Sequence, residues 1–235
     1  MPSAILVAHG APADPPSQER VLQALAAAVG GLLPGWVVRG ATLAADGELE
    51  SALAGLDAPF VYPFFMAEGW FTGTHLPRRL AQAGATGARQ LPPLGVDPDL
   101  PALIAQVTMA AAGRAGIAPE TATLLLAAHG SKVSRVSADS TWAMAAALRP
   151  LTRFARITAG FVEETPFLAQ AATGLSPAIC LPFFALHAGH VADDVPQALA
   201  AAGFTGPLLP EIGSDPAIPG LIAAALRRAF DSNRP

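Results

Sequence analysis

The stretch LLLAAHGSKVSR, residues 124–135, is an apolar run that ends abruptly in His129, Gly130 and Ser131. The start of the chain repeats this pattern, because AILVAHGAP, residues 4–12, brings His9 to the same place 120 residues earlier. A short apolar run without polar alternation is typical of a strand that is buried on both faces, as in a parallel sheet. A glycine after such a strand allows a tight turn. The two stretches therefore predict matching strands, each with a histidine at its carboxyl end.

The similarity between the two parts of the chain extends well beyond these histidines. Residues 63–87 align without gaps to residues 182–206, with identical residues at ten of the 25 positions. Further on, LPPLGVDPDLPALI (91–104) matches LPEIGSDPAIPGLI (209–222). A period of this length is too long for a solenoid repeat. The sequence therefore indicates a duplicated domain.

Glycine, proline and polar residues gather at 114–121, which predicts the joint between the two copies. We therefore expect an N-terminal half, residues 1–115, and a C-terminal half, residues 116–235, which carries the chemistry. Strands and helices alternate along each half, which indicates an α/β fold with a parallel sheet flanked by helices. We expect the active-site cleft between the halves.

The expected elements follow from the apolar runs and from the Ala/Leu-rich stretches between them. The expected strands are 4–8, 36–43, 59–65, 122–128, 155–162 and 178–184, and the expected helices are 17–29, 48–56, 74–83, 99–113, 138–149, 166–174, 193–202 and 216–230.

Composition narrows the class of protein. Hydrophobic residues make up 52% of the chain and charged residues 14%, so a filled core is easily supplied. No apolar run approaches the roughly 20 residues that cross a bilayer, and the chain does not start like a signal peptide, so we expect a cytoplasmic protein. The net charge of −4 without a basic run disfavours a nucleic-acid partner. The single cysteine, Cys180, excludes an internal disulfide and a site built from four cysteines.

Polar residues with metal-binding and acid–base chemistry follow the expected strands of the C-terminal half. His129 follows one strand, Glu163 and Glu164 follow a second, and His187 and His190 follow a third. Ligands bind outside the carboxyl ends of parallel strands, so these side chains are expected at one edge. Imidazole and carboxylate suit Fe, Co, Ni or Zn, and they also suit proton abstraction near neutral pH.

Simpler explanations exist for each residue alone. A single histidine at a strand end is commonly a loop residue, and Asp193 and Asp194 fit a helix cap and the helix dipole. Ser131 lacks the G-x-S-x-G pattern of a nucleophile elbow. The site hypothesis depends on convergence, because four of the five histidines lie at expected strand ends and three of them belong to one half.

Two motifs of the C-terminal half resemble those of a known family. LLLAAHGS (124–131) and LPFFALHAGHVADDVP (181–196) are similar to the A-H-G-S strand end and the later G-H-V-x-x-D-[IV]-P segment of the class II sirohydrochlorin chelatases, the CbiX/SirB group. The C-terminal half also carries a glutamate after its second strand, whereas the N-terminal half matches only partly, with AHGAP. The resemblance covers essentially the whole chain as a duplicated form.

This resemblance implies an ATP-independent lyase that inserts Fe²⁺ or Co²⁺ into sirohydrochlorin, in siroheme or cobalamin biosynthesis. It assigns metal handling and proton acceptance to His129 and His190, with Glu163 as the supporting carboxylate. The tetrapyrrole and the metal are then substrates, no cofactor is permanently bound, and the protein is a monomer or a homodimer. On an extended strand end neighbouring side chains point to opposite sides, so we expect Glu163 to face the site and Glu164 to point away.

The N-terminal half lacks most of these groups. Leu43 corresponds to Glu163 at a spacing of 120, and Phe71 corresponds to His190 at a spacing of 119. Leu and Phe can neither bind a metal nor accept a proton, so we expect this half to supply apolar surface for the macrocycle. His9 either helps with substrate protons and orientation or is a structural relic. The expected substrate-binding residues are His9, Ser131, Lys132, Trp70, Phe71, Arg78, Arg79 and His187.

Two other functions compete with chelation. A non-catalytic Co/Ni-binding delivery or regulatory protein would carry the same histidines. A flavodoxin-like nucleotide binder is disfavoured, because no G-x-G-x-x-G or P-loop pattern follows any strand. Ligand type separates iron from cobalt poorly. Some long cobalt-associated members of the family carry a His-rich or Cys-rich segment, and its absence here favours iron.

Overall fold

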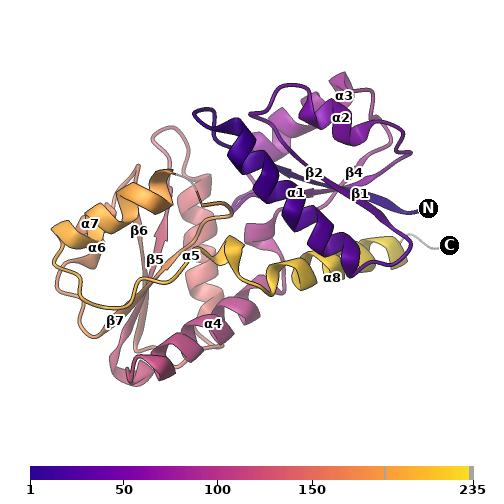
Figure 1. Ribbon diagram of the computed structural model, residues 1–235. Helices are drawn as coiled ribbons and strands as arrows, with labels where there is room; N and C mark the ends of the chain where they lie inside the picture. The colour runs from indigo at the N-terminus through magenta and orange to yellow at the C-terminus, as the bar shows by residue number, and fades with distance from the viewer. Residues whose placement is uncertain (188, 233–235) are drawn as a thin grey trace. The chain divides into compact units, whose positions relative to one another are not determined.

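The chain folds into two compact α/β units. The computed structural model describes residues 1–187 and 189–232, and the side chain of His190 lies outside what it describes. Unit 1 comprises Met1–Asp97 together with the segment from Pro216 onward, and unit 2 comprises Pro98–Asp215 (Figure 1). Each unit has a parallel sheet with helices on both faces, which confirms the expected fold class.

Unit 1 is built on a four-stranded parallel sheet with the order β2-β1-β3-β4. Its strands are β1 (Ser3–Ala8), β2 (Val37–Thr42), β3 (Phe60–Pro63) and β4 (Arg89–Gln90). In the register of the sheet, Val7 lies opposite both Ala41 and Pro63. All three strands around this point therefore end at one edge, where His9 follows.

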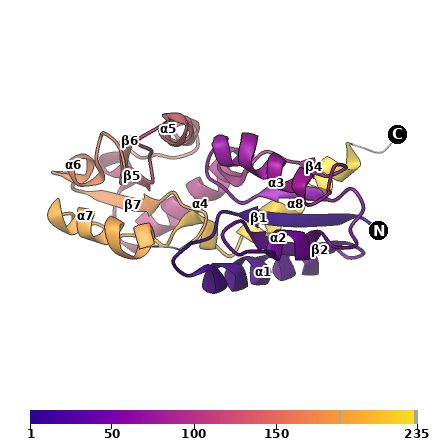
Figure 2. The ribbon, with the colours of Figure 1, turned by 90° about the horizontal axis from the view of Figure 1, so that it is seen from above.

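Helices cover both faces of the sheet of unit 1. They are α1 (Pro15–Gly31), α2 (Glu48–Leu53), α3 (Leu76–Gln82) and α8 (Ile218–Asp231), with a π-helical turn η1 (Phe71–His75) and a 3₁₀ turn η2 (Leu94–Val96). Ile5 and Val7 of β1 pack with Leu49 of α2 and Leu76 of α3. On the opposite face α1 packs so closely that a side chain on Gly40 would meet the carbonyl of Leu22 at 2.6 Å. Figure 2 shows α1 along the sheet of this unit.

Unit 2 repeats this plan with a three-stranded parallel sheet in the order β6-β5-β7. The strands are β5 (Thr123–Ala128), β6 (Arg156–Phe161) and β7 (Ala178–Pro182). The helices are α4 (Leu100–Arg114), α5 (Val136–Leu148), α6 (Leu168–Ala172) and α7 (Val195–Ala201), with the short turns η3 (Pro119–Thr121), η4 (His190–Asp194) and η5 (Ile212–Ser214). Leu125 and Cys180 pack with Leu168 of α6 and Leu199 of α7, which buries one face of the sheet.

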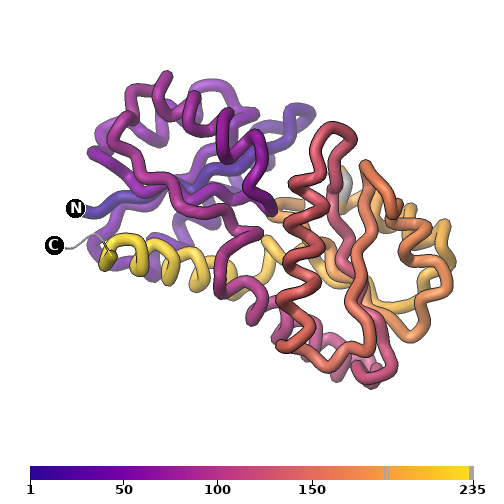
Figure 3. The backbone as a smooth tube through the Cα atoms, turned by 180° about the vertical axis from the view of Figure 1, so that it is seen from behind, coloured from indigo at the N-terminus to yellow at the C-terminus, as the bar shows by residue number. Residues whose placement is uncertain are grey.

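The compact units differ from the units of the sequence repeat. The expected halves, 1–115 and 116–235, each end in a long helix, but α4 packs on α5 and β7 of unit 2, and α8 packs on α1 and β3 of unit 1. In unit 1, Arg228 of α8 donates a hydrogen bond to the buried Asp97 at 3.3 Å, and Phe230 packs edge-on against Trp36. Figure 3 shows α8 in yellow beside the indigo N-terminal segment of the same unit. The last helix of each sequence repeat therefore belongs to the compact unit that the other repeat forms.

The expected strands and helices all have counterparts, with ends that differ by a few residues. The short strand β4 and the π-helical turns η1 and η4 were not expected. Within the described residues, no helix is long and apolar enough to span a membrane.

Candidate active site

His129 is the first residue beyond β5, on a loop whose conformation is restricted by Gly130. Gly130 has φ +71°, and a Cβ there would lie 2.8 Å from Cγ of Glu164 and 2.9 Å from Cβ of Phe161, so only glycine fits. The His129 ring is exposed, and its Nδ1 lies 2.9 Å from the carbonyl oxygen of Gly130. This contact favours the tautomer with hydrogen on Nδ1, which leaves the lone pair on Nε2.

Glu163 lies directly beside His129 through the backbone of the sheet. Hydrogen bonding between the two segments continues past the ends of β5 and β6, so the Glu163 N–H donates to the carbonyl of His129 at 2.9 Å. The Glu163 carboxylate forms an ion pair with Nζ of Lys132 at 3.2 Å, and the Glu163 side chain is 29% exposed. A histidine, a carboxylate and a cation therefore share one strand-end edge.

Glu164 also reaches this loop, contrary to expectation. Its Oε1 accepts a hydrogen bond from the Ser131 N–H at 2.9 Å. The alternation of side chains does not continue here because the chain bends from Val162 onward. Glu164 therefore supports the loop that carries His129, whereas Glu163 pairs with an exposed lysine.

Ser131 gives the loop its turn. The Ser131 Oγ accepts hydrogen bonds from the N–H groups of Val133 and Ser134, both at 3.3 Å. Such a serine turn orders the chain between β5 and α5. Ser131 was expected to bind substrate, and these two bonds use its oxygen as an acceptor within the loop.

His187 forms a pair with a residue that the sequence did not single out. Its Nδ1 lies 3.1 Å from Oε2 of Glu211, whose side chain is only 7% exposed, while that of His187 is 62% exposed. The available signal was an acidic residue within the otherwise apolar stretch LLPEIG (208–213). In the aligned segment of the N-terminal half this position is Pro93.

His190 begins the π-helical turn η4, which directly precedes α7. Its side chain was expected to bind the metal, but that side chain lies outside the part of the chain that the structure describes. Among the side chains that are described, no group of three His, Cys, Asp or Glu could hold a metal ion.

Unit 1 has the same strand-end frame with different side chains. The Ala44 N–H donates to the carbonyl of His9 at 2.9 Å, as Glu163 does to His129. The structural counterpart of Glu163 is therefore Ala44, and the expected correspondence with Leu43 is wrong by one residue. Neither Leu nor Ala supplies a metal ligand.

The ring of His9 contacts Phe71, which belongs to a cluster of rings in unit 1. Its ring lies 4.4 Å from that of Phe71 between centroids, and Phe71 lies 5.7 Å from His75, on which Trp70 stacks at 4.9 Å. Partial burial lowers the pKa of His9 from 6.5, and the charge of His75 lowers it further. His9 is therefore neutral at pH 7, and Trp70, 55% exposed, offers an aromatic surface.

The two expected arginines of unit 1 differ in their surroundings. Arg79 donates to Glu50 at 3.2 Å, whereas Arg78 is exposed. Near η1 lies a pocket of about 400 Å³, lined by Glu68, Gly69, Thr72, Gly73, Gln90, Leu91, Pro92 and Pro93.

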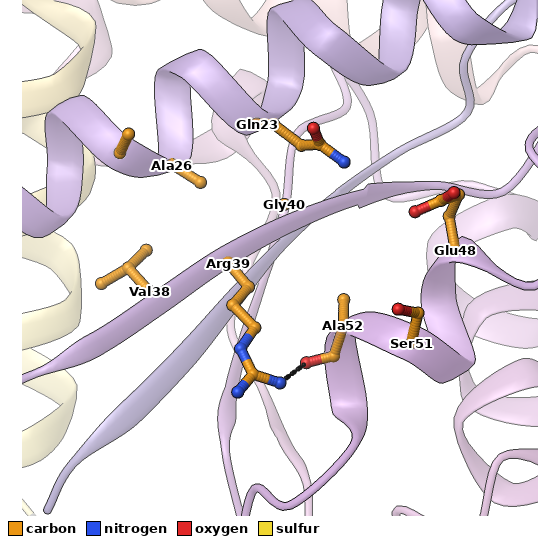
Figure 4. A pocket seen from close by; sticks show the side chains of 9 residues that line it. Gln23, Ala26, Val38, Arg39, Gly40, Glu48, Ser51 and Ala52 are labelled. Carbon is orange, nitrogen blue, oxygen red and sulfur yellow. Dashed lines mark hydrogen bonds between the residues drawn. The ribbon is translucent and has the colours of Figure 1, made fainter.

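A second pocket of unit 1 lies along the edge strand β2, between α1 and α2. It has a volume of about 430 Å³, and Figure 4 shows the side chains that line it. Arg39 is its cationic residue, and it donates to the carbonyls of Ala52 and Ala54 at 2.9 and 2.8 Å. The pocket contains no histidine, so it lacks the residue types of the strand-end sites.

Comparisons with known proteins agree with this architecture. The sequence profile of the CbiX family matches residues 123–229. The chain is 48% identical to a CbiX described as the terminal enzyme for biosynthesis of siroheme in denitrifying bacteria, with a TM-score of 0.89 over 97% of this chain and 99% of that one. The comparison with curated protein sequences gave no match.

More distant structures share the fold. SirB from Bacillus subtilis with Fe³⁺ is 16% identical, with a TM-score of 0.74 over 99% of this chain and 98% of that one. SirB from Bacillus subtilis subspecies spizizenii in complex with cobalt is 15% identical, with a TM-score of 0.71 over 99% and 97%. Three findings agree: the repeated strand-end histidines, the matched family profile, and 48% identity to CbiX over nearly the whole of both chains. Together they show that the chain belongs to the CbiX/SirB family of class II sirohydrochlorin chelatases.

Proposed function

We propose that the protein inserts a divalent metal into sirohydrochlorin without ATP, and that unit 2 carries the metal chemistry. The observation that carries this proposal is the pairing at the end of β5 and β6. His129 has its Nδ1 held by the Gly130 carbonyl, and Glu163 is hydrogen-bonded to the His129 backbone. Membership of the chelatase family supplies the class of reaction.

The reaction requires two things of these side chains. The metal must lose water and be held loosely, and two pyrrole N–H bonds must break as nitrogen–metal bonds form. The Nε2 of a neutral histidine can bind Fe²⁺ or Co²⁺ reversibly, and a second histidine or Glu163 can accept a proton. We assign the metal to His129, Glu163 and His190.

The cysteine does not compete for the metal. A thiolate would hold a soft or borderline ion too tightly for release. Burial raises the pKa of Cys180 to about 12, so its thiol stays protonated in the core of unit 2.

Two cations that follow β5, of which Lys132 pairs with Glu163, suit an acidic tetrapyrrole. The side chain of Lys132 is 74% exposed and that of Arg135 is 79% exposed, although the chain as a whole has a net charge of −4. We propose that Lys132 exchanges Glu163 for a substrate carboxylate, which frees Glu163 for the metal. Ser131 and His187 complete the polar surface of unit 2 toward substrate.

We assign a binding role to unit 1. Ala44 and Phe71 stand where unit 2 has Glu163 and His190, so unit 1 lacks two of the three metal-handling groups. Its exposed Trp70 and the adjoining Phe71 suit one face of a flat macrocycle. Neutral His9 and the arginines Arg78 and Arg79 are assigned to substrate orientation.

Iron is the proposed physiological metal. The 48% identical CbiX is described as a siroheme enzyme, and siroheme contains iron.

The test is anaerobic metal insertion, followed by the absorbance of sirohydrochlorin with Fe²⁺ and with Co²⁺. We expect the protein to accelerate insertion of both ions over the spontaneous reaction, without ATP. Arg153→Ala, which changes an exposed residue of unit 2, is the control and should have the rate of the wild type. A protein that binds Co²⁺ but gives no acceleration would instead be a delivery protein.

A further inference from the structure

An exposed histidine joined to a buried carboxylate is an unusual feature of unit 2. The Nδ1 of His187 lies 3.1 Å from Oε2 of Glu211. Glu211 is 6% exposed as a residue, so its carboxylate is largely removed from water. Burial of a carboxylate costs free energy, and an interaction with a group that can donate hydrogen offsets that cost.

The backbone fixes the position of this carboxylate relative to His187. Glu211 directly precedes the turn η5, in which the Gly213 N–H donates to the carbonyl of Phe184 at 3.0 Å. A Cβ on Gly213 would lie 1.9 Å from the carbonyl oxygen of Ala185, so η5 is in direct contact with the segment that leads to His187. Glu211 is thus held against the histidine by close packing of main chain.

Unit 1 has the same packing but not the pair. A Cβ on Gly95 would lie 1.9 Å from the carbonyl oxygen of Met66, as in unit 2. The residues that align with His187 and Glu211 are Glu68 and Pro93. The fold therefore forms without this pair, which occurs in the unit that also carries His129 and Glu163.

We propose that Glu211 is a positioning residue for His187, and that His187 accepts one of the two pyrrole protons during metal insertion. The Glu211 carboxylate accepts the Nδ1–H of His187, which leaves the lone pair on Nε2. When the proton arrives at Nε2, the carboxylate stabilises the imidazolium. This inference rests on the proposed function and assigns a role within it.

The proton transfer is balanced as follows. One pyrrole N–H bond breaks, its electron pair stays on the ring nitrogen and binds the metal, and the proton forms a new bond to Nε2 of His187. The second pyrrole proton goes to the His129, Glu163 and His190 group. His187 then returns its proton to water, which its 62% exposed side chain reaches directly.

The experiment compares His187→Ala and Glu211→Gln with Glu120→Gln, a control in which an exposed glutamate of the same unit is changed. We expect kcat for metal insertion to fall about 100-fold in His187→Ala, the usual range for general base catalysis. Glu211→Gln keeps an oxygen acceptor for Nδ1–H but loses the charge, so a fall of about 10-fold is expected. The Kd for Co²⁺, measured without the tetrapyrrole, should be unchanged in both.

Chemical rescue separates a proton acceptor from a structural residue. Added imidazole should restore a large part of kcat in His187→Ala and should leave the wild type unaffected. Wild-type kcat in both variants, or no rescue of a slow His187→Ala, would overturn the inference while leaving the proposed function in place. A weaker Kd for Co²⁺ in His187→Ala would also overturn it, because His187 would then be a metal ligand. Failure of the wild type to insert metal would overturn the proposed function itself.

Discussion

The two adjacent glutamates after β6 differ in what they contact. Glu164 accepts the Ser131 N–H, so it stabilises the loop, whereas Glu163 forms an ion pair with an exposed lysine. A buried or half-buried N–H that loses its partner costs roughly 1–3 kcal/mol.

We therefore predict opposite phenotypes for two variants. Glu163→Gln should slow metal insertion by at least about 10-fold with an unchanged free energy of unfolding, because it removes a charged acceptor. Glu164→Ala should lower the free energy of unfolding by about 1–2 kcal/mol, because Ser131 N–H loses its acceptor. Urea denaturation and the absorbance assay measure the two quantities. If Glu164→Ala were stable but inactive and Glu163→Gln were active, the prediction would be contradicted, and Glu164 rather than Glu163 would serve metal insertion.

The aromatic surroundings of His9 give a prediction for its titration. Partial burial lowers the pKa of His9 below 6.5, and the charge of His75 lowers it further. Its folded pKa lies below its unfolded one, so His9 contributes stability above about pH 6.5 that is lost as the pH falls through the folded pKa. NMR titration should give a midpoint below 6.5 for the His9 ring, and His75→Gln should raise it. A midpoint at or above 6.5 would contradict the partial burial of the His9 ring beside His75.

At the scale of elements, the loop between β5 and α5 depends on one glycine. Gly130 and Gly174 both have φ +71°, but a Cβ would meet Glu164 and Phe161 at Gly130 and open space at Gly174. Both alanine variants bear the cost of a left-handed conformation, roughly 1 kcal/mol. Gly130→Ala bears the additional clash.

Gly130→Ala should therefore be less stable than Gly174→Ala in urea denaturation, and it should also lose metal insertion, because the turn that orients His129 must shift. Gly174→Ala should retain activity. Equal stability and equal activity of the two variants would show that the loop adapts to the extra methyl group.

Much of the element pattern could be predicted from the sequence. The apolar runs before His9 and His129 correspond to β1 and β5, because strands buried on both faces need no polar alternation. β4 has only two residues, which is too short for any periodicity. The first three residues of the turn η1, FTG, were assigned to no helix because they carry no helical apolar pattern, and its last two residues fell in the expected helix 74–83.

The site was predicted in part for similar reasons. A histidine after a strand is visible in the sequence, so His129 and Glu163 could be paired from strand order alone. The contact between Glu211 and His187 could not be predicted, because the two residues are 24 positions apart and meet only through the tertiary packing of η5. Glu164 was expected to point away from the His129 loop, and this was wrong because local bending overrides side-chain alternation after Phe161.

At the scale of the whole molecule, the exchange of α4 and α8 determines which fragments can fold. Residues 98–215 form one continuous compact unit, whereas the sequence repeat 116–235 lacks α4 and retains α8. Without α4, apolar surface on α5 and β7 would be exposed to water.

We predict that a fragment of residues 98–215 unfolds cooperatively, and that a fragment of residues 116–235 is unstable or aggregates. Thermal unfolding followed by circular dichroism distinguishes them. A cooperative transition for 116–235 and none for 98–215 would show that the repeat, rather than the compact unit, is the folding unit.

The central claim is that the two units have divided their work, with metal handling in unit 2. Both retain a histidine at the end of the first strand. The backbone N–H that donates to the His129 carbonyl belongs to Glu163, a carboxylate residue, whereas the N–H that donates to the His9 carbonyl belongs to Ala44.

The most direct measurement compares His129→Ala with His9→Ala in the same anaerobic insertion assay. We predict that His129→Ala lowers the rate at least about 100-fold with folding retained, and that His9→Ala has a clearly smaller effect. A larger loss in His9→Ala than in His129→Ala would contradict the account and move the metal chemistry to unit 1.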